Sequence, residues 1–68
     1  MKSFWIKERQ NPQLGTYYTA CGQMTKTVAK KCEQSIYGHN QMHRFDTEAS
    51  YLTKLAELRA AGERVYAN

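Results

Sequence analysis

Residues 45–66 read FDTEASYLTKLAELRAAGERVY, and this stretch decides the fold because it marks both ends of a helix. Asp46 offers a carboxylate that accepts a hydrogen bond from the first amides of a helix beginning at Thr47. Glu48 adds negative charge at the positive end of the helix dipole. Gly62 is the residue type that best tolerates a left-handed helix end. The stretch therefore predicts a helix between two strands.

The apolar residues of this helix share one side at helical spacing: Tyr51, Leu52, Leu55 and Leu58. Its opposite side is polar, as in a helix that packs on a sheet. We expect the apolar side to belong to the core.

The first 21 residues predict a β-hairpin. Residues 3–10 alternate as a half-buried strand requires, with Phe4 and Ile6 on one side. The other side carries Trp5, Lys7 and Arg9. The segment 11–15, Asn-Pro-Gln-Leu-Gly, has the composition of a hairpin loop, and residues 16–21 are rich in β-forming residues.

A second helix is predicted after residues 22–24, which we interpret as a linker. Thr25 is its N-cap and Gly38 ends it. Lys26 and Lys30 lie on its solvated side. Its apolar stripe repeats every four residues, beside Ala29: Val28, Cys32 and Ile36.

Residues 39–45 allow one short strand with Arg44 on its outer face, and residues 64–66 predict a terminal strand with Val65 inward. Residues 1–68 thus form a single α+β domain in the order β-β-α-β-α-β. Right-handed crossovers predict a small sheet with both helices packed on one face. The predicted core on that face is Phe4, Ile6, Tyr18, Ala20, Val28, Cys32, Ile36, Phe45, Leu52, Leu55, Leu58 and Val65.

The face left uncovered is the candidate binding surface, because it combines aromatic rings with cations. Such surfaces bind single-stranded nucleic acid through base stacking and phosphate pairing. The same residue types are enriched in protein interfaces, and they also pair across strands in ordinary sheets. The candidate binding residues, with two lysines from the second helix, are Trp5, Lys7, Arg9, Tyr17, Arg44, Arg64, Tyr66, Lys26 and Lys30.

Two thiols and two imidazoles are the groups that invite a metal or catalytic interpretation: Cys21, Cys32, His39 and His43. The cysteines are too far apart for a zinc knuckle, so we expect them to pack as small apolar residues. Nothing brings a thiol, an imidazole and an orienting group together. No metal, cofactor or enzymatic activity is predicted.

Composition narrows the class of partner. A net charge of +4 on 68 residues favours an acidic partner: nucleic acid, an anionic membrane or an acidic protein face. The first residues lack the apolar run of a signal peptide, and no stretch is long enough to span a membrane. We expect a cytoplasmic protein with reduced thiols and no membrane partner.

The chain resembles the small accessory proteins of tailed bacteriophages, which include anti-CRISPR proteins. The resemblance covers its size, its opening hairpin with Asn-Pro-Gln-Leu-Gly-Thr-Tyr-Tyr, and its Phe-Asp-Thr-Glu-Ala helix start leading to a final Gly-x-x-Val strand. It implies a stoichiometric binder that blocks or redirects a complex in the bacterial host cell, often one that handles nucleic acid. The positive charge departs from the acidic DNA mimics among them.

The leading expectation is a non-catalytic interaction protein that docks on a host protein or ribonucleoprotein complex and inhibits or modulates it. The alternative is a direct nucleic-acid binder that uses the same residues. The sequence leaves the oligomeric state open.

Overall fold

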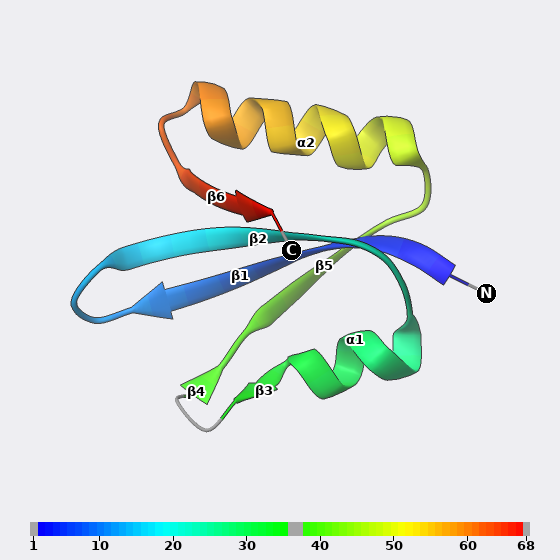
Figure 1. The fold of residues 1–68 in the computed structure, drawn as a ribbon, viewed down its shortest axis with the longest axis horizontal. Helices are drawn as coiled ribbons and strands as arrows, with labels where there is room; N and C mark the ends of the chain where they lie inside the picture. Colours follow the sequence, from blue (N-terminus) through cyan, green and yellow to red (C-terminus); the bar gives the residue numbers. More distant parts are fainter. Residues whose placement is uncertain (1, 36–37, 68) are drawn as a thin grey trace.

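The computed structural model describes residues 2–35 and 38–67, shown as a ribbon in Figure 1. They contain the predicted order β-β-α-β-α-β, with an extra ladder of two short strands after the first helix. The chain is therefore a small α+β domain. The elements are β1 (Lys2–Asn11), β2 (Gly15–Thr25), α1 (Lys26–Cys32), β3 (Gln34–Ser35), β4 (Gly38–His39), β5 (Gln41–Phe45), α2 (Glu48–Ala60) and β6 (Arg64–Ala67).

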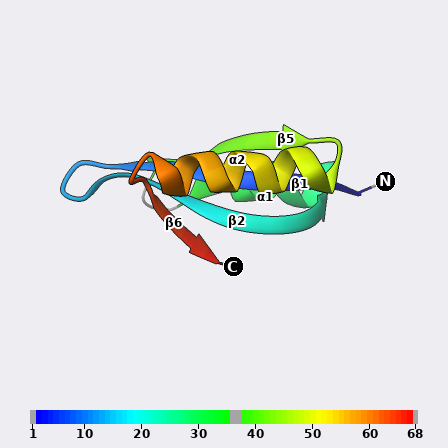
Figure 2. The same cartoon turned by 90° about the horizontal axis from the view of Figure 1, so that it is seen from above.

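A four-stranded mixed sheet in the order β5-β1-β2-β6 forms the centre of the fold. β1 runs antiparallel to both of its neighbours, and β6 joins β2 in parallel. Ile6 lies near the middle, opposite Ala20 on β2 and His43 on β5. Figure 2 looks onto this sheet with α2 in front of it.

The two helices lie on opposite faces of the sheet, with α2 above it and α1 below it in Figure 1. The prediction that both pack on one face is wrong. The connection through α1 runs from β2 past β1 to β5, and the connection through α2 returns from β5 to the far side of β2. Connections between parallel strands of one sheet are right-handed. The two connections cross the sheet in opposite directions, so their helices lie on opposite faces. We call the two sides the α1 face and the α2 face.

The main hydrophobic core lies between α2 and the sheet. Ile6 is 1% exposed at its centre, and Tyr51, Leu55 and Leu58 of α2 are buried against it. The prediction that Leu52 faces inward is wrong, since it is 52% exposed. Successive helix residues are about 100° apart, so a helix that turns Tyr51 to the sheet directs Leu52 to solvent. Most of the predicted core is confirmed around this cluster: Phe4, Tyr18, Ala20, Phe45 and Val65.

The ends of α2 follow from local chemistry. Thr47, rather than Asp46, is the N-cap, because its Oγ1 accepts a hydrogen bond from the backbone N–H of Ser50 at 3.2 Å. The helix therefore begins at Glu48, one residue later than predicted. Gly62 has a φ of +80° just after the helix, which confirms the predicted left-handed end.

β2 continues through residues 22–24, so the predicted linker there is wrong. The pairing with β1 shifts after Trp5, which leaves Cys21 as the extra residue of a β-bulge. Gly22 takes a φ of +71° at the bulge, a conformation that glycine adopts without strain. Its N–H donates a hydrogen bond to the Tyr51 hydroxyl at 3.1 Å, which ties the bulge to α2.

α1 is shorter than predicted, because it ends at Cys32 and Gly38 lies in β4 instead. Thr25 is its N-cap as predicted, with Oγ1 accepting a hydrogen bond from the Val28 N–H at 3.3 Å. The predicted inward position of Ile36 lies outside the described residues.

α1 packs on the sheet through Ala29, which is 1% exposed, whereas Val28 is 45% exposed. The prediction that Val28 faces inward is therefore wrong. The indole of Trp5 lies under α1 next to Ala29, whose small side chain lets the helix approach β1 closely. Trp5 is 7% exposed, and its Nε1–H donates to the Met24 carbonyl at 2.9 Å. The prediction that Trp5 projects from an uncovered face is wrong.

The short strand predicted within residues 39–45 is present as β5, which begins at Gln41. Phe45 packs on the core, and Arg44 faces the opposite side of the strand as predicted, which is the α1 face because Arg44 pairs with Trp5. Asn40 lies between β4 and β5 and is 9% exposed.

Candidate functional site

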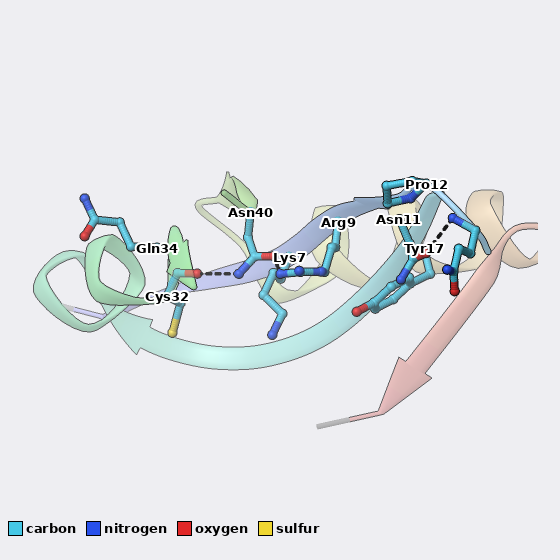
Figure 3. A pocket seen from close by; sticks show the side chains of 9 residues that line it. Lys7, Arg9, Asn11, Pro12, Tyr17, Cys32, Gln34 and Asn40 are labelled. Carbon is cyan, nitrogen blue, oxygen red and sulfur yellow. Dashed lines mark hydrogen bonds between the residues drawn. The ribbon is translucent and has the colours of Figure 1, made fainter. Parts of the chain in front are cut away.

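The α1 face has a covered part and an open part. α1 covers the sheet at Trp5, and farther along β1 the side chains of Lys7 and Arg9 line a hollow of about 700 Å³. Tyr17 of β2 lines the same hollow, opposite Arg9 in the strand register. Three of the predicted binding residues therefore share one surface. Figure 3 shows this hollow between the hairpin loop and the end of α1.

Asn40 joins two walls of the hollow. Its Nδ2 donates to the Cys32 carbonyl at 2.8 Å, and its Oδ1 accepts a hydrogen bond from Arg9 Nη1 at 3.2 Å. Its backbone N–H donates to the Glu33 carbonyl at 2.7 Å. Asn40 thus supplies donors to carbonyls at the end of α1, where a helix has no partners of its own, and it positions the Arg9 guanidinium.

The hairpin loop forms the opposite end of the hollow. Asn11 Oδ1 accepts hydrogen bonds from the backbone N–H groups of Gln13 at 2.8 Å and Leu14 at 3.0 Å. Gly15 closes the loop with a φ of +84°. A side chain that bonds the backbone ahead of it in this way holds a turn in one shape. The Asn11 amide oxygen is therefore engaged inside the loop, and the side chains of Asn11 and Gln13 line the hollow from it.

An aromatic pair lies beside the cations. The rings of Tyr17 and Tyr66 meet edge to face, with centroids 5.7 Å apart and an interplanar angle of 87°. Arg64 pairs with Tyr17 in the parallel ladder of β2 and β6, which puts it on the same face. The predicted grouping of Tyr17, Arg64 and Tyr66 is present in the structure.

α1 adds three exposed lysines to this face, Lys26, Lys30 and Lys31. They line a second hollow together with Thr27 and Gln34. Because Gln34 lines the main hollow as well, the two hollows are neighbours on one surface. Lys31 is missing from the sequence-based set of binding residues.

Charge is segregated between the two faces. Four acidic residues lie on the α2 side, Glu8, Glu48, Glu57 and Glu63, against three cations, Lys2, Lys54 and Arg59. Arg44 also lies on the α1 face, opposite Trp5 in the strand register, but it is paired with Asp46. Outside that ion pair, the α1 face carries one acidic residue, Glu33, at the end of α1. It also carries six of the ten basic residues: Lys7, Arg9, Lys26, Lys30, Lys31 and Arg64.

Two predicted binding residues lie apart from the hollow. Trp5 is buried under α1. Arg44 is on the edge strand β5, where its Nε donates to Ser3 Oγ at 3.1 Å and its Nη2 lies 3.4 Å from Asp46 Oδ1. Local pairing therefore occupies the Arg44 guanidinium.

The thiols and the described imidazole do not converge. Cys21 and Cys32 are free and partly buried, and burial raises the pKa of the Cys21 thiol although nearby Lys7 opposes the shift. His43 Nε2 lies 2.8 Å from Glu8 Oε1 on the α2 face. Within residues 2–35 and 38–67, no group of three or more His, Cys, Asp or Glu side chains could hold a metal ion. The side chain of His39 lies outside the described set.

No family model, curated protein or solved structure matches this chain. No helix in the described part of the chain is long and apolar enough to cross a membrane.

Proposed function

We propose that this chain is a non-catalytic binding protein whose α1 face binds nucleic acid. The observation that carries the proposal is the segregation of charge. Outside the Arg44–Asp46 ion pair, six basic side chains and one acidic side chain share the α1 face, although the whole chain carries a net charge of only +4. A face of this kind suits a polyanion, because each phosphate that a cation neutralises releases condensed counterions.

The groups between the cations fit the same ligand. Tyr17 and Tyr66 offer ring surfaces on which bases stack, a contact worth about 1–3 kcal/mol per base. The Gln13 amide carries a donor and an acceptor like those on base edges, and Asn11 Nδ2 adds a donor. Cations, aromatic rings and amides side by side are the chemistry of a nucleic-acid surface.

The state of the thiols supports binding rather than catalysis. Because burial raises the pKa of Cys21, the thiol stays protonated at neutral pH and is a poor nucleophile. His43 is engaged by Glu8 on the α2 face, whereas Cys21 lies near Lys7 on the other side of the sheet. A thiol–imidazole pair would need both groups on one side.

Docking on a host protein complex is the second candidate, and the resemblance to phage accessory proteins supports it. Protein interfaces depend on a few clustered aromatic anchors. Trp5, the strongest such anchor in the sequence, is only 7% exposed. The large apolar side chains that are exposed lie apart, in the hairpin loop and on α1, α2 and β6: Leu14, Val28, Leu52 and Tyr66. This scatter favours nucleic acid as the main ligand.

A pair of charge-matched variants tests the proposal. Lys26→Ala with Lys30→Ala removes two cations from the α1 face, and Lys54→Ala with Arg59→Ala removes two from α2. All four side chains are exposed, so both variants should keep the fold. Fluorescence anisotropy with a labelled single strand of about 20 nucleotides, longer than a typical binding module covers, measures affinity.

Both variants have the same net charge, so a difference between them reports position. We expect the α1-face variant to bind at least tenfold more weakly than the parent at low salt, and the α2 variant to bind within about threefold of it. Equal losses would mean that only total charge matters. No binding by the parent protein would leave docking on a protein complex as the better interpretation.

A further inference from the structure

The main hollow has dimensions and walls suited to a small ligand. Its volume of about 700 Å³ lies within the range of roughly 300–1,000 Å³ that is usual for small-molecule sites. It is closed at one end by the hairpin loop and at the other by the end of α1 (Figure 3). The hollow is open to solvent rather than enclosed, so it has room for one unit of a chain molecule that continues past it.

The chemistry of the walls differs from one side to the next. Lys7 and Arg9 project from β1, and Tyr17 lies beside them on β2 with its hydroxyl directed toward Lys7 (Figure 3). Asn40 and Asn11 close the two ends. The hollow thus presents two cations, one aromatic ring and side-chain amides within a single concave site.

The key side chains are held in place before any ligand binds. Arg9 is held by Asn40, which is 9% exposed and itself bonded to the end of α1. The Tyr17 ring rests edge to face on Tyr66. A site whose groups are already ordered loses less conformational entropy on binding.

We infer that this hollow holds one unstacked nucleotide of a bound strand, with its base against Tyr17 and its phosphates against Lys7 and Arg9, so that the protein prefers single-stranded to duplex nucleic acid. The inference rests on the proposed function and specifies its ligand. A base in a single strand enters the hollow freely. A base in a duplex must first leave its stack and its partner, at a cost of a few kcal/mol.

The first test needs no variant. The affinity of the parent protein is measured for a labelled single strand, for a hairpin duplex of the same length, and for a single strand in which abasic sites replace the bases. All three carry the same number of phosphates, so phosphate contacts alone would give the two single strands similar affinities and would favour the duplex, whose charge density is higher. We expect the ordinary single strand to bind roughly 5- to 150-fold more tightly than the abasic strand, the loss equivalent to one stacked base, and more tightly than the duplex.

Two variants then locate the contact. Tyr17→Leu removes the ring but keeps an apolar side chain, and it should reduce single-strand affinity by a factor in the same range while leaving duplex affinity within about threefold. Tyr17→Phe keeps the ring and should bind like the parent. Fluorescence of the buried Trp5 checks that each variant is folded.

The results separate the inference from the function on which it rests. Equal affinities for the three nucleic acids, with the α1 lysines still required, would refute the nucleotide site and leave the binding function intact. The inference also fails if Tyr17→Leu weakens duplex and single strand by the same factor. If none of the three binds, the proposed function itself is wrong.

Discussion

Replacing Trp5 tests the arrangement of the two helices, because the residue is buried only if α1 covers its side of the sheet. Trp5 is 7% exposed beneath Ala29. Truncating a buried Trp or Phe to Ala costs about 3–5 kcal/mol. A chain of 68 residues has a free energy of unfolding of about 3–10 kcal/mol. Trp5→Ala should therefore remove a large part of the stability.

A second substitution divides this loss between packing and hydrogen bonding. Trp5→Phe keeps most of the apolar contact but removes the indole N–H that donates to the Met24 carbonyl at 2.9 Å. Loss of one hydrogen bond of this kind costs about 0.5–1.5 kcal/mol. We therefore expect Trp5→Phe to be less destabilised than Trp5→Ala by at least about 1.5 kcal/mol.

Urea unfolding followed by far-ultraviolet circular dichroism measures the stability of every variant. Tryptophan fluorescence cannot be used, since Trp5 is the single tryptophan and both substitutions remove it. Leu52→Ala is the matched control, because that side chain is 52% exposed and its loss should cost about 0.5 kcal/mol or less. If Trp5→Ala unfolded at the same urea concentration as the parent, Trp5 would be on an open surface and the helices would not cover opposite faces.

Three further predictions concern the core, the site and pH. Leu55→Ala should cost about 2–5 kcal/mol, measured by thermal melting, because Leu55 is 4% exposed in the cluster under α2. Asn40→Ala should cost about 1–3 kcal/mol and also weaken single-strand binding, since it releases Arg9, whereas the exposed neighbour Gln41→Ala should do neither. The free energy of unfolding should fall as pH rises above about 9, because burial raises the pKa values of Cys21 and Tyr18 from ordinary values of 9.0 and 10.0. The unfolded chain then loses these two protons at a lower pH than the folded chain does. A stability that is constant up to pH 11 would contradict this prediction.

The parts of the fold that the sequence predicts correctly are those with local signals. α2 carries its own cap, its own apolar spacing and Gly62 at its end. The alternation in β1 places Ile6 and Lys7 on opposite sides without knowledge of any other element. Thr25 likewise marks the start of α1 through a contact only three residues away.

The errors arise where distant elements decide the outcome. The faces that the helices cover depend on the strand order β5-β1-β2-β6, which no local pattern encodes. Val28 fits the apolar repeat of the predicted helix better than Ala29 does. Ala29 faces inward nevertheless, because the indole of Trp5 already fills the space beneath α1. Leu52 likewise faces solvent, because Tyr51 is turned to the sheet, where its hydroxyl accepts a hydrogen bond from the Gly22 N–H at the bulge.

The site follows the same rule. The alternation of β1 correctly groups Lys7 and Arg9, and the β2–β6 ladder brings Tyr66 to Tyr17. Asn40 has no signal in the sequence, because its role depends on the ends of α1 and β1 meeting across separations of 8 and 31 residues.

The salt dependence of single-strand binding tests the central claim most directly. The logarithm of the association constant for the labelled strand is measured against the logarithm of salt concentration, for the parent and for Lys26→Ala with Lys30→Ala. Six phosphate contacts at about 0.7 each predict a straight line with a slope near −4, and loss of two contacts should flatten it by about 1.4. A parent slope near zero, or the same slope in the variant, would contradict the claim that the α1 face binds nucleic acid through its phosphates.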